Sequence, residues 1–148
     1  MIIKKELRIK EIEDNLSSVY EAVEIVSENL PKSFNKFSEL GLKKDGIYKK
    51  IEFAIESILD IFNIINSDLR LGVPDVEEEI IDNIEKNNLL DKSAIEIVRE
   101  MKKFRNVLVH KYGKIDDRLA FESVVQGISD FEIVLKEIES FLKRNKPK

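Results

Sequence analysis

The only histidine of the chain, His110, lies five residues after Arg105 in the segment 105–112, which reads RNVLVHKY. Histidine titrates near neutral pH and can therefore donate or accept a proton in a reaction. Arginine binds phosphate oxygens with two N–H groups at once and stabilises negative charge that develops on them. Such a pair suits metal-free cleavage of RNA, which needs a 2′-hydroxyl deprotonated, a 5′-oxygen protonated and a phosphorane stabilised.

This segment closes a predicted amphipathic helix that begins near Ser93 and stops at Gly113. At about 100° per residue, Arg105 falls inside the apolar arc of that helix. A charge in such a stripe is unfavourable unless it is paired or lines a groove. Arg105 is therefore expected either to face a ligand or to form a salt bridge with a neighbouring helix. The apolar residues of the arc are Ala94, Ile97, Val98, Met101, Phe104 and Leu108.

His110 does not face Arg105 on an unbroken helix, because five residues correspond to a rotation of about 140°. Either the helix loosens near His110, or the two residues meet through a second chain. One chain supplies one histidine, whereas a two-fold dimer would bring two histidines and two arginines to one cleft. The second possibility therefore has a chemical advantage.

Charge along the chain is uneven, although the net charge of −4 makes the protein acidic as a whole. The segment 99–118 holds seven basic and three acidic residues, which leaves −8 on the rest. A basic patch on an acidic body can attract a polyanion, whereas most charge runs are solvated helix faces. Four lysines of the patch are candidates for RNA contact: Lys102, Lys103, Lys111 and Lys114.

The elements that position these residues are all predicted helices, since no strand-like alternation and no internal repeat is present. Residues 33–46 are ambiguous, with a short helical turn and breaks at Gly41 and Gly46. Asp116 or Asp117 is expected to cap the last helix. The predicted helices cover about residues 4–29, 47–69, 76–86, 93–112 and 117–142.

The fold class that follows is all-α, an antiparallel up-and-down bundle of four to five helices. The 148 residues fit a single domain, 1–148, which can bury a core without disulfides or metals. Residues 143–148 are basic and are expected to form a loose tail.

Composition excludes several kinds of chemistry. Cysteine is absent, which rules out disulfides, cysteine zinc sites and a cysteine nucleophile, and one histidine cannot build a histidine-rich metal site. A carboxylate-only Mg²⁺ site stays open, and the run 77–79 of three glutamates is one place for it, although acids in a first helical turn usually complement the dipole. No phosphate-binding glycine loop is present. Without a signal peptide or an apolar span, the protein is expected to be cytoplasmic, away from membranes and without a cofactor.

The motif R-x4-H-x-Y in segment 105–112, with the polar Asn106 after the arginine, resembles HEPN domains, specifically the HepT-like ribonuclease toxin family. Further landmarks appear in the family's order. Residues 48–51 (YKKI) open a long helix, and residues 71–74 (LGVP) follow it. The similarity covers about residue 47 to the last helix. The long first helix and the 33–46 connection depart from the family pattern.

The resemblance implies an HEPN-like helical bundle and a metal-independent endoribonuclease that is the toxin of a type VII-like HEPN/MNT toxin–antitoxin pair. It implies that Arg105 and His110 are catalytic in a cleft of a homodimer and that Asn106 supports them. It also implies that Tyr112 receives AMP from a partner minimal nucleotidyltransferase antitoxin, which blocks access of RNA.

Two alternatives stay open beside this hypothesis. The first is a non-catalytic helical partner or substrate-binding subunit of a nucleotidyltransferase, and the second is a plain helical adaptor. An Arg105 that is salt-bridged in the core and distant from His110 would favour the adaptor. Tyr112 could likewise be a residue packed at the helix end instead of an accessible modification site.

Overall fold

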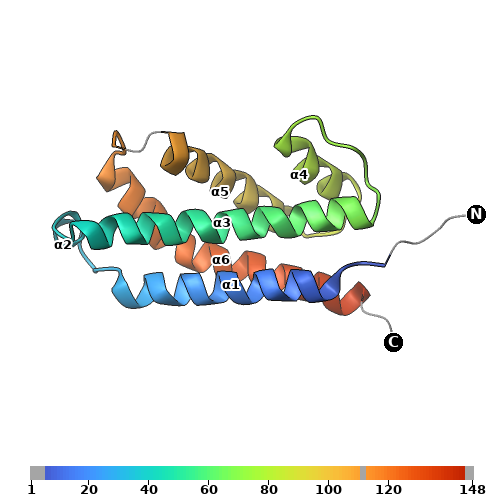
Figure 1. The fold of residues 1–148 in the computed structure, drawn as a ribbon, viewed down its shortest axis with the longest axis horizontal. Coiled ribbons are helices and arrows are strands. Elements are labelled where there is room, and N and C mark those ends of the chain that lie inside the picture. The colour runs from blue at the N-terminus through green and yellow to red at the C-terminus, as the bar shows by residue number, and fades with distance from the viewer. Residues whose placement is uncertain (1–5, 111–112, 146–148) are drawn as a thin grey trace, which may run out of the picture.

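Six helices make up the regular structure of the residues described by the computed structural model, which are 6–110 and 113–145 (Figure 1). Four long helices run alternately up and down, and no strand occurs among the described residues. The predicted all-α antiparallel bundle is confirmed. The long helices are α1 (Ile9–Asn29), α3 (Leu42–Asp68), α5 (Lys92–His110) and α6 (Asp117–Asn145), and the short ones are α2 (Phe34–Ser38) and α4 (Glu77–Lys86).

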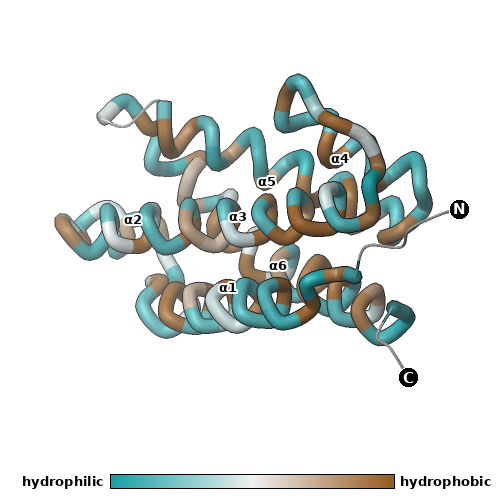
Figure 2. Tube along the Cα trace, turned by 45° about the vertical axis from the view of Figure 1, so that its right-hand side comes forward, coloured by the Kyte–Doolittle hydropathy of each residue, from teal (hydrophilic) through white to brown (hydrophobic). Residues whose placement is uncertain are grey.

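The helix α3 is central and packs against α1, α4 and α5. Its apolar residues face several sides, among them the fully buried Ile58, Ile61 and Phe62, which is typical of a helix surrounded by others. Hydrophobic and hydrophilic residues alternate along the other helices, as Figure 2 shows. Among the described residues, no helix is both long enough and apolar enough to cross a membrane.

The beginning of α3 differs from the prediction. The helix starts at Leu42, so Gly46 lies inside it and the predicted break at Gly46 is wrong. Glycine destabilises a helix by roughly 1 kcal/mol relative to alanine, and burial of the next two residues, Ile47 and Tyr48, offsets that. The break at Gly41 is real, because its φ of 61° lies in the left-handed region.

At the start of α6, Asp116 is the cap, since its carboxylate accepts the backbone N–H groups of Arg118 at 3.1 Å and Leu119 at 3.2 Å. Asp117 instead accepts the Tyr48 hydroxyl at 2.6 Å and binds the Lys44 ammonium at 2.7 Å. These bonds tie the start of α6 to the start of α3. At its other end α6 continues to Asn145, through the first half of the segment predicted to be a loose tail.

Candidate functional site

Helix α5 turns Arg105 towards the interior. Val98, Met101 and Leu108 of the same helix are buried, and they fix which face of α5 points inwards. The side chain of Arg105 is only 11% exposed, in keeping with its position in the apolar arc. It lies where α5 meets α3 and α4, as its partners there show.

Two carboxylates from different helices bind the Arg105 guanidinium. Nη1 donates to Oε1 of Glu56 on α3 at 2.5 Å, and Nη2 donates to Oε1 of Glu77 in the first turn of α4. Nε donates to the side-chain oxygen of Asn106 at 3.0 Å. Burial lowers the pKa of Arg105, but the bonds to Glu56 and Glu77 raise it further, so the pKa lies above its ordinary value. Arg105 is therefore a paired charge, not an open phosphate-binding group.

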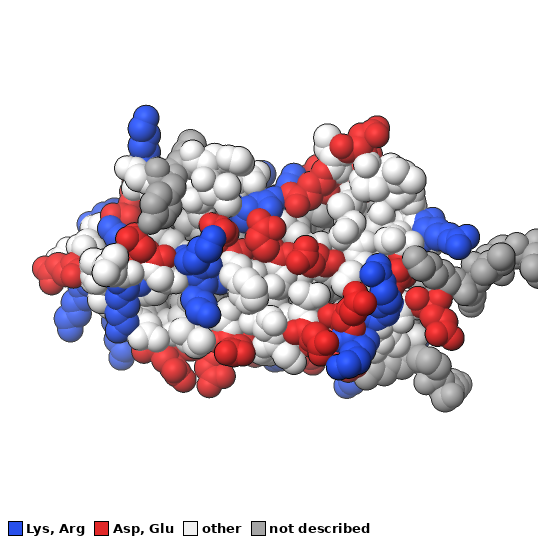
Figure 3. Space-filling model, in the orientation of Figure 1, with Lys and Arg blue, Asp and Glu red and all other residues white. Residues whose placement is uncertain are grey.

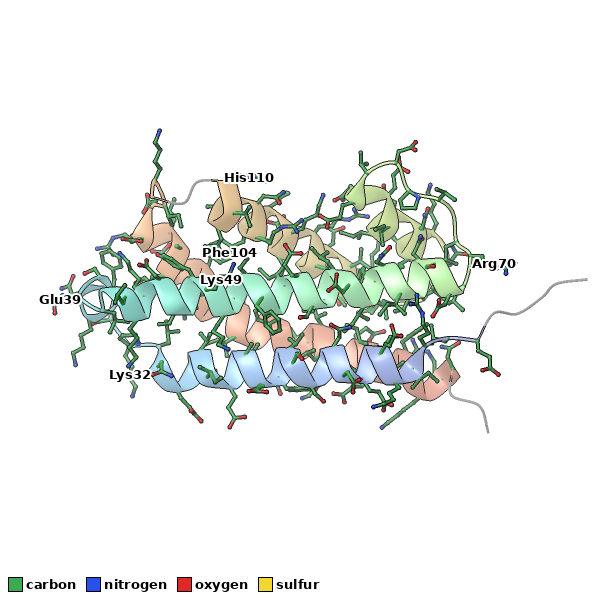
Figure 4. All side chains as sticks on the ribbon, in the orientation of Figure 1. Lys32, Glu39, Lys49, Arg70, Phe104 and His110 are labelled. Carbon is green, nitrogen blue, oxygen red and sulfur yellow. The ribbon has the colours of Figure 1, made fainter. Side chains whose placement is uncertain are left out.

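His110 is the last residue of α5 and is exposed (Figure 4). The helix runs to His110 without interruption, so the first of the two alternatives, a helix that loosens near His110, finds no support up to that residue, and residues 111–112 lie outside the described residues. The side chains of Arg105 and His110 consequently point about 140° apart. One chain does not bring them together, and the two-chain arrangement is the alternative that remains.

The lysines predicted to contact RNA have varied surroundings. Lys102 binds Glu78 at 3.1 Å, and Lys103 binds Glu100 of its own helix at 3.0 Å. Lys114 is exposed after α5. Lys111 and Tyr112 lie outside the described residues.

The glutamate run 77–79 explains much of this pairing, and its role was missed by the sequence prediction, which assigned it to the helix dipole. Glu77 binds Arg105, while Glu78 binds Arg99 and Lys102. Glu79 accepts the backbone N–H of Asp75 at 3.0 Å. Figure 3 shows acidic and basic side chains side by side where α4 and α5 meet α3. Three of the seven basic residues of the predicted patch, Arg99, Lys102 and Arg105, are thus paired with acids of α4.

The acids near Arg105 do not form a recognisable metal site. Asp60 lies one turn after Glu56 on α3, and its pKa is raised by burial and by the charges of Glu56 and Glu77. Among residues 6–110 and 113–145, no group of three or more histidine or acidic side chains is arranged to hold a metal ion.

A groove with a volume of about 620 Å³ lies between α3, α5 and α6. Its α5 wall combines apolar residues, among them Phe104 (labelled in Figure 4), with the charged Glu100 and Lys103. On the α6 side Leu119 is 61% exposed. An exposed leucine beside partly buried apolar residues in a groove is a feature of surfaces that another molecule covers.

Known proteins share both the fold and the sequence pattern. The mRNA nuclease HepT of Shewanella oneidensis is 25% identical over 97 residues, which are 66% of this chain and 73% of that protein. A solved structure of the tri-AMPylated HEPN toxin of Shewanella oneidensis in complex with MNT antitoxin matches with a TM-score of 0.78 and 20% identity. That match covers 88% of this chain and 97% of the toxin chain.

The cytosolic protein YutE of Bacillus subtilis has the same fold at 15% identity, with a TM-score of 0.76 and with 93% and 92% of the two chains covered. The sequence model of the ribonuclease HepT-like family matches residues 12–138, from α1 to the end of the α6 core. The chain therefore belongs to the HepT-like family of HEPN ribonucleases.

Proposed function

We propose that the protein is a metal-independent endoribonuclease and the toxin of a toxin–antitoxin pair. The observation that carries this proposal is the family match over residues 12–138, a range within which Arg105 and His110 lie on the last turns of α5. In the proposed reaction His110 transfers a proton, and Arg105 stabilises the charge of the phosphorane. Asn106, which already holds Nε of Arg105, orients the guanidinium.

The proposed site belongs to a homodimer. Arg105 and His110 diverge on α5, and a single chain has one histidine for two proton transfers. A two-fold axis near the end of α5 would bring two copies of each residue to one cleft. The apolar groove beside Phe104 and Leu119 offers surface that such a dimer could bury.

The test is cleavage of RNA in EDTA by the full chain, by Arg105→Ala and by His110→Ala. We expect cleavage by the unchanged protein and loss in both variants. Equal cleavage by all three proteins, or by none, would contradict the proposal. Circular dichroism of each variant checks that the bundle remains folded.

A second function has its own observation. Arg105 is paired with Glu56 and Glu77, and one chain keeps it away from His110, which favours a plain helical adaptor. The other non-catalytic alternative, a helical partner subunit, would bind a nucleotidyltransferase without cutting RNA. Co-purification with the transferase together with inactivity in the EDTA assay would favour this alternative.

The proposed partner is a minimal nucleotidyltransferase antitoxin that transfers AMP to Tyr112. The support is the HEPN toxin of Shewanella oneidensis, which is tri-AMPylated and bound to an MNT antitoxin. Mass spectrometry after co-expression with the transferase tests the assignment. AMP groups on the peptide that contains Tyr112, and their loss in Tyr112→Phe, are expected, and an unmodified Tyr112 would contradict it.

A further inference from the structure

The surface over Arg105 is acidic, although the residue itself is basic. The side chains of Glu56 and Glu77 are 41% and 37% exposed, whereas that of Arg105 is 11% exposed. The two carboxylates that bind Arg105 are thus more exposed than the guanidinium between them. An approaching phosphate therefore meets carboxylates before it reaches the guanidinium, and like charges repel it.

We infer that Glu56 and Glu77 determine which anions Arg105 accepts, because they compete with phosphate for its guanidinium. This inference rests on the proposed function and extends it. A carboxylate tethered to the same fold has an effective concentration in the millimolar range or above. A single free phosphate binds only at Arg105 and must displace a glutamate there without help from other contacts. An RNA chain binds through many phosphates at once, and those contacts help it to displace the glutamate. The two glutamates thus make the site selective for a polynucleotide.

Release of Glu77 requires little loss of packing. Helix α4 buries only Ile81 and Ile84 within its own length, and both lie beyond its first turn. The residues just before it, Val73 and Val76, are exposed. Glu77 can therefore rotate away without opening the core, while Glu78 stays bound to Arg99 and Lys102.

The hydrogen bonds of Arg105 to Glu56, Glu77 and Asn106 use three of its five N–H donors. Displacement of Glu77 alone would free an Nη2 donor, while Glu56 and Asn106 still hold the other two nitrogens. The guanidinium would then remain oriented while it binds a phosphate oxygen. Glu77 is accordingly expected to have the larger effect on RNA affinity.

The first experiment measures binding of a single-stranded oligoribonucleotide to His110→Ala, so that no cleavage interferes. Adding Glu77→Gln is expected to tighten binding roughly three- to tenfold at low salt. Glu85→Gln is the matched control, since it removes another α4 charge, one that binds Arg99 and no residue proposed to contact RNA. The gain should vanish when Arg105→Ala is also present. Equal gains for the two glutamine variants, or a gain that survives Arg105→Ala, would overturn the inference.

The second experiment needs no RNA and follows modification of Arg105 by an arylglyoxal, peptide by peptide, with mass spectrometry. Glu77→Gln and the double variant Glu56→Gln/Glu77→Gln are expected to accelerate modification of Arg105 and to leave that of Arg118 unchanged. Inorganic phosphate should protect Arg105 only in the double variant. An unchanged rate of Arg105 modification in the variants, or protection of Arg105 by phosphate in the protein without substitutions, would overturn the inference.

The two proposals fail in different ways. Tighter, Arg105-dependent RNA binding without any cleavage in EDTA would contradict the ribonuclease function alone. Cleavage that depends on Arg105 and His110, with no effect of Glu77→Gln on binding or labelling, would contradict the role of the glutamates alone.

Discussion

Helix α5 carries two arginines, Arg99 and Arg105, which are both largely buried and both paired with acids of α4, yet their surroundings differ. Arg99 binds four carboxylates, of which three belong to α4 and one to its own helix. Arg105 binds one carboxylate of α3, one of α4 and the amide of Asn106. The side chains are 17% and 11% exposed, so burial alone does not distinguish them.

The difference lies in what each pairing achieves. The partners of Arg99 are Glu78, Asp82 and Glu85, spaced by three or four residues along one face of α4, together with Glu96. That arrangement fastens α4 to α5. Arg105 has fewer acids and an orienting neighbour, and it is followed by His110. We interpret Arg99 as a structural residue and Arg105 as a functional one, and each becomes the control for the other.

The largest expected effect is on catalysis. Arg105→Ala should reduce RNA cleavage at least roughly 100-fold, which is typical for loss of a group that stabilises transition-state charge. Arg99→Ala should retain activity within a few-fold once the fraction of folded protein is accounted for. Initial rates in EDTA measure both, and a similar loss in the two variants would erase the distinction.

The next effect is on stability and runs in the opposite order. Arg99→Ala leaves four carboxylates near one another without their cation and should lower the free energy of unfolding by about 1–3 kcal/mol. Arg105→Ala leaves only the two half-exposed glutamates, and its effect should be about 1 kcal/mol or less. Urea denaturation compares the two variants, and a greater loss for Arg105→Ala would reverse our assignment.

Much of the fold and part of the site could be predicted from the sequence. The apolar arc of α5 places Arg105 inwards, because helical spacing is a local property. The partners of Arg105 were not predictable in the same way, since Glu56 and Glu77 lie 49 and 28 residues away. Their contact depends on how α3, α4 and α5 slide against one another, and core packing decides that.

The glutamate run shows the same limit at shorter range. Acidic residues in the first turn of any helix interact favourably with its dipole. The sequence therefore could not show that Glu77 and Glu78 bind different arginines. Gly46 illustrates the reverse case, in which burial of Ile47 and Tyr48 overrides a local break. Glu78, Asp82 and Glu85 are spaced so that they share one face of α4 and require a positive charge opposite them. That spacing is the signal that could have revealed the Arg99 cluster.

A third cluster, away from α4, serves as a reference for both arginines. The Tyr48 hydroxyl is buried and donates a hydrogen bond to Asp117. Burial is the larger cause, and the hydrogen bond the smaller one, of the raised pKa of Tyr48. Tyr48→Phe should lower the free energy of unfolding by about 1 kcal/mol, because one hydrogen bond to a charged acceptor is lost. Arylglyoxal labelling of Arg105 should not change in this variant. Faster labelling would show that the start of α6 and the arginine are coupled.

The smallest expected effect concerns pH. Burial raises the pKa of Asp117, but its bonds with Lys44 and Tyr48 lower it more, so the pKa in the folded protein lies below the usual value of about 3.9. The stability gained is present above that value and is lost as the pH falls through the folded pKa. The free energy of unfolding of Asp117→Asn should therefore lie below that of the unchanged protein at about pH 7, and the difference should be smaller at about pH 3. A difference that grows in acid would have the wrong sign.

Mixing two inactive variants tests the central claim most directly. Arg105→Ala and His110→Ala are combined, allowed to exchange protomers, and assayed for RNA cleavage in EDTA. If Arg105 of one chain acts together with His110 of the other, a mixed dimer contains one intact pair of this kind, and part of the activity should return although the second histidine is absent. No recovery, despite exchange verified with differently tagged protomers, would contradict a site composed of both chains.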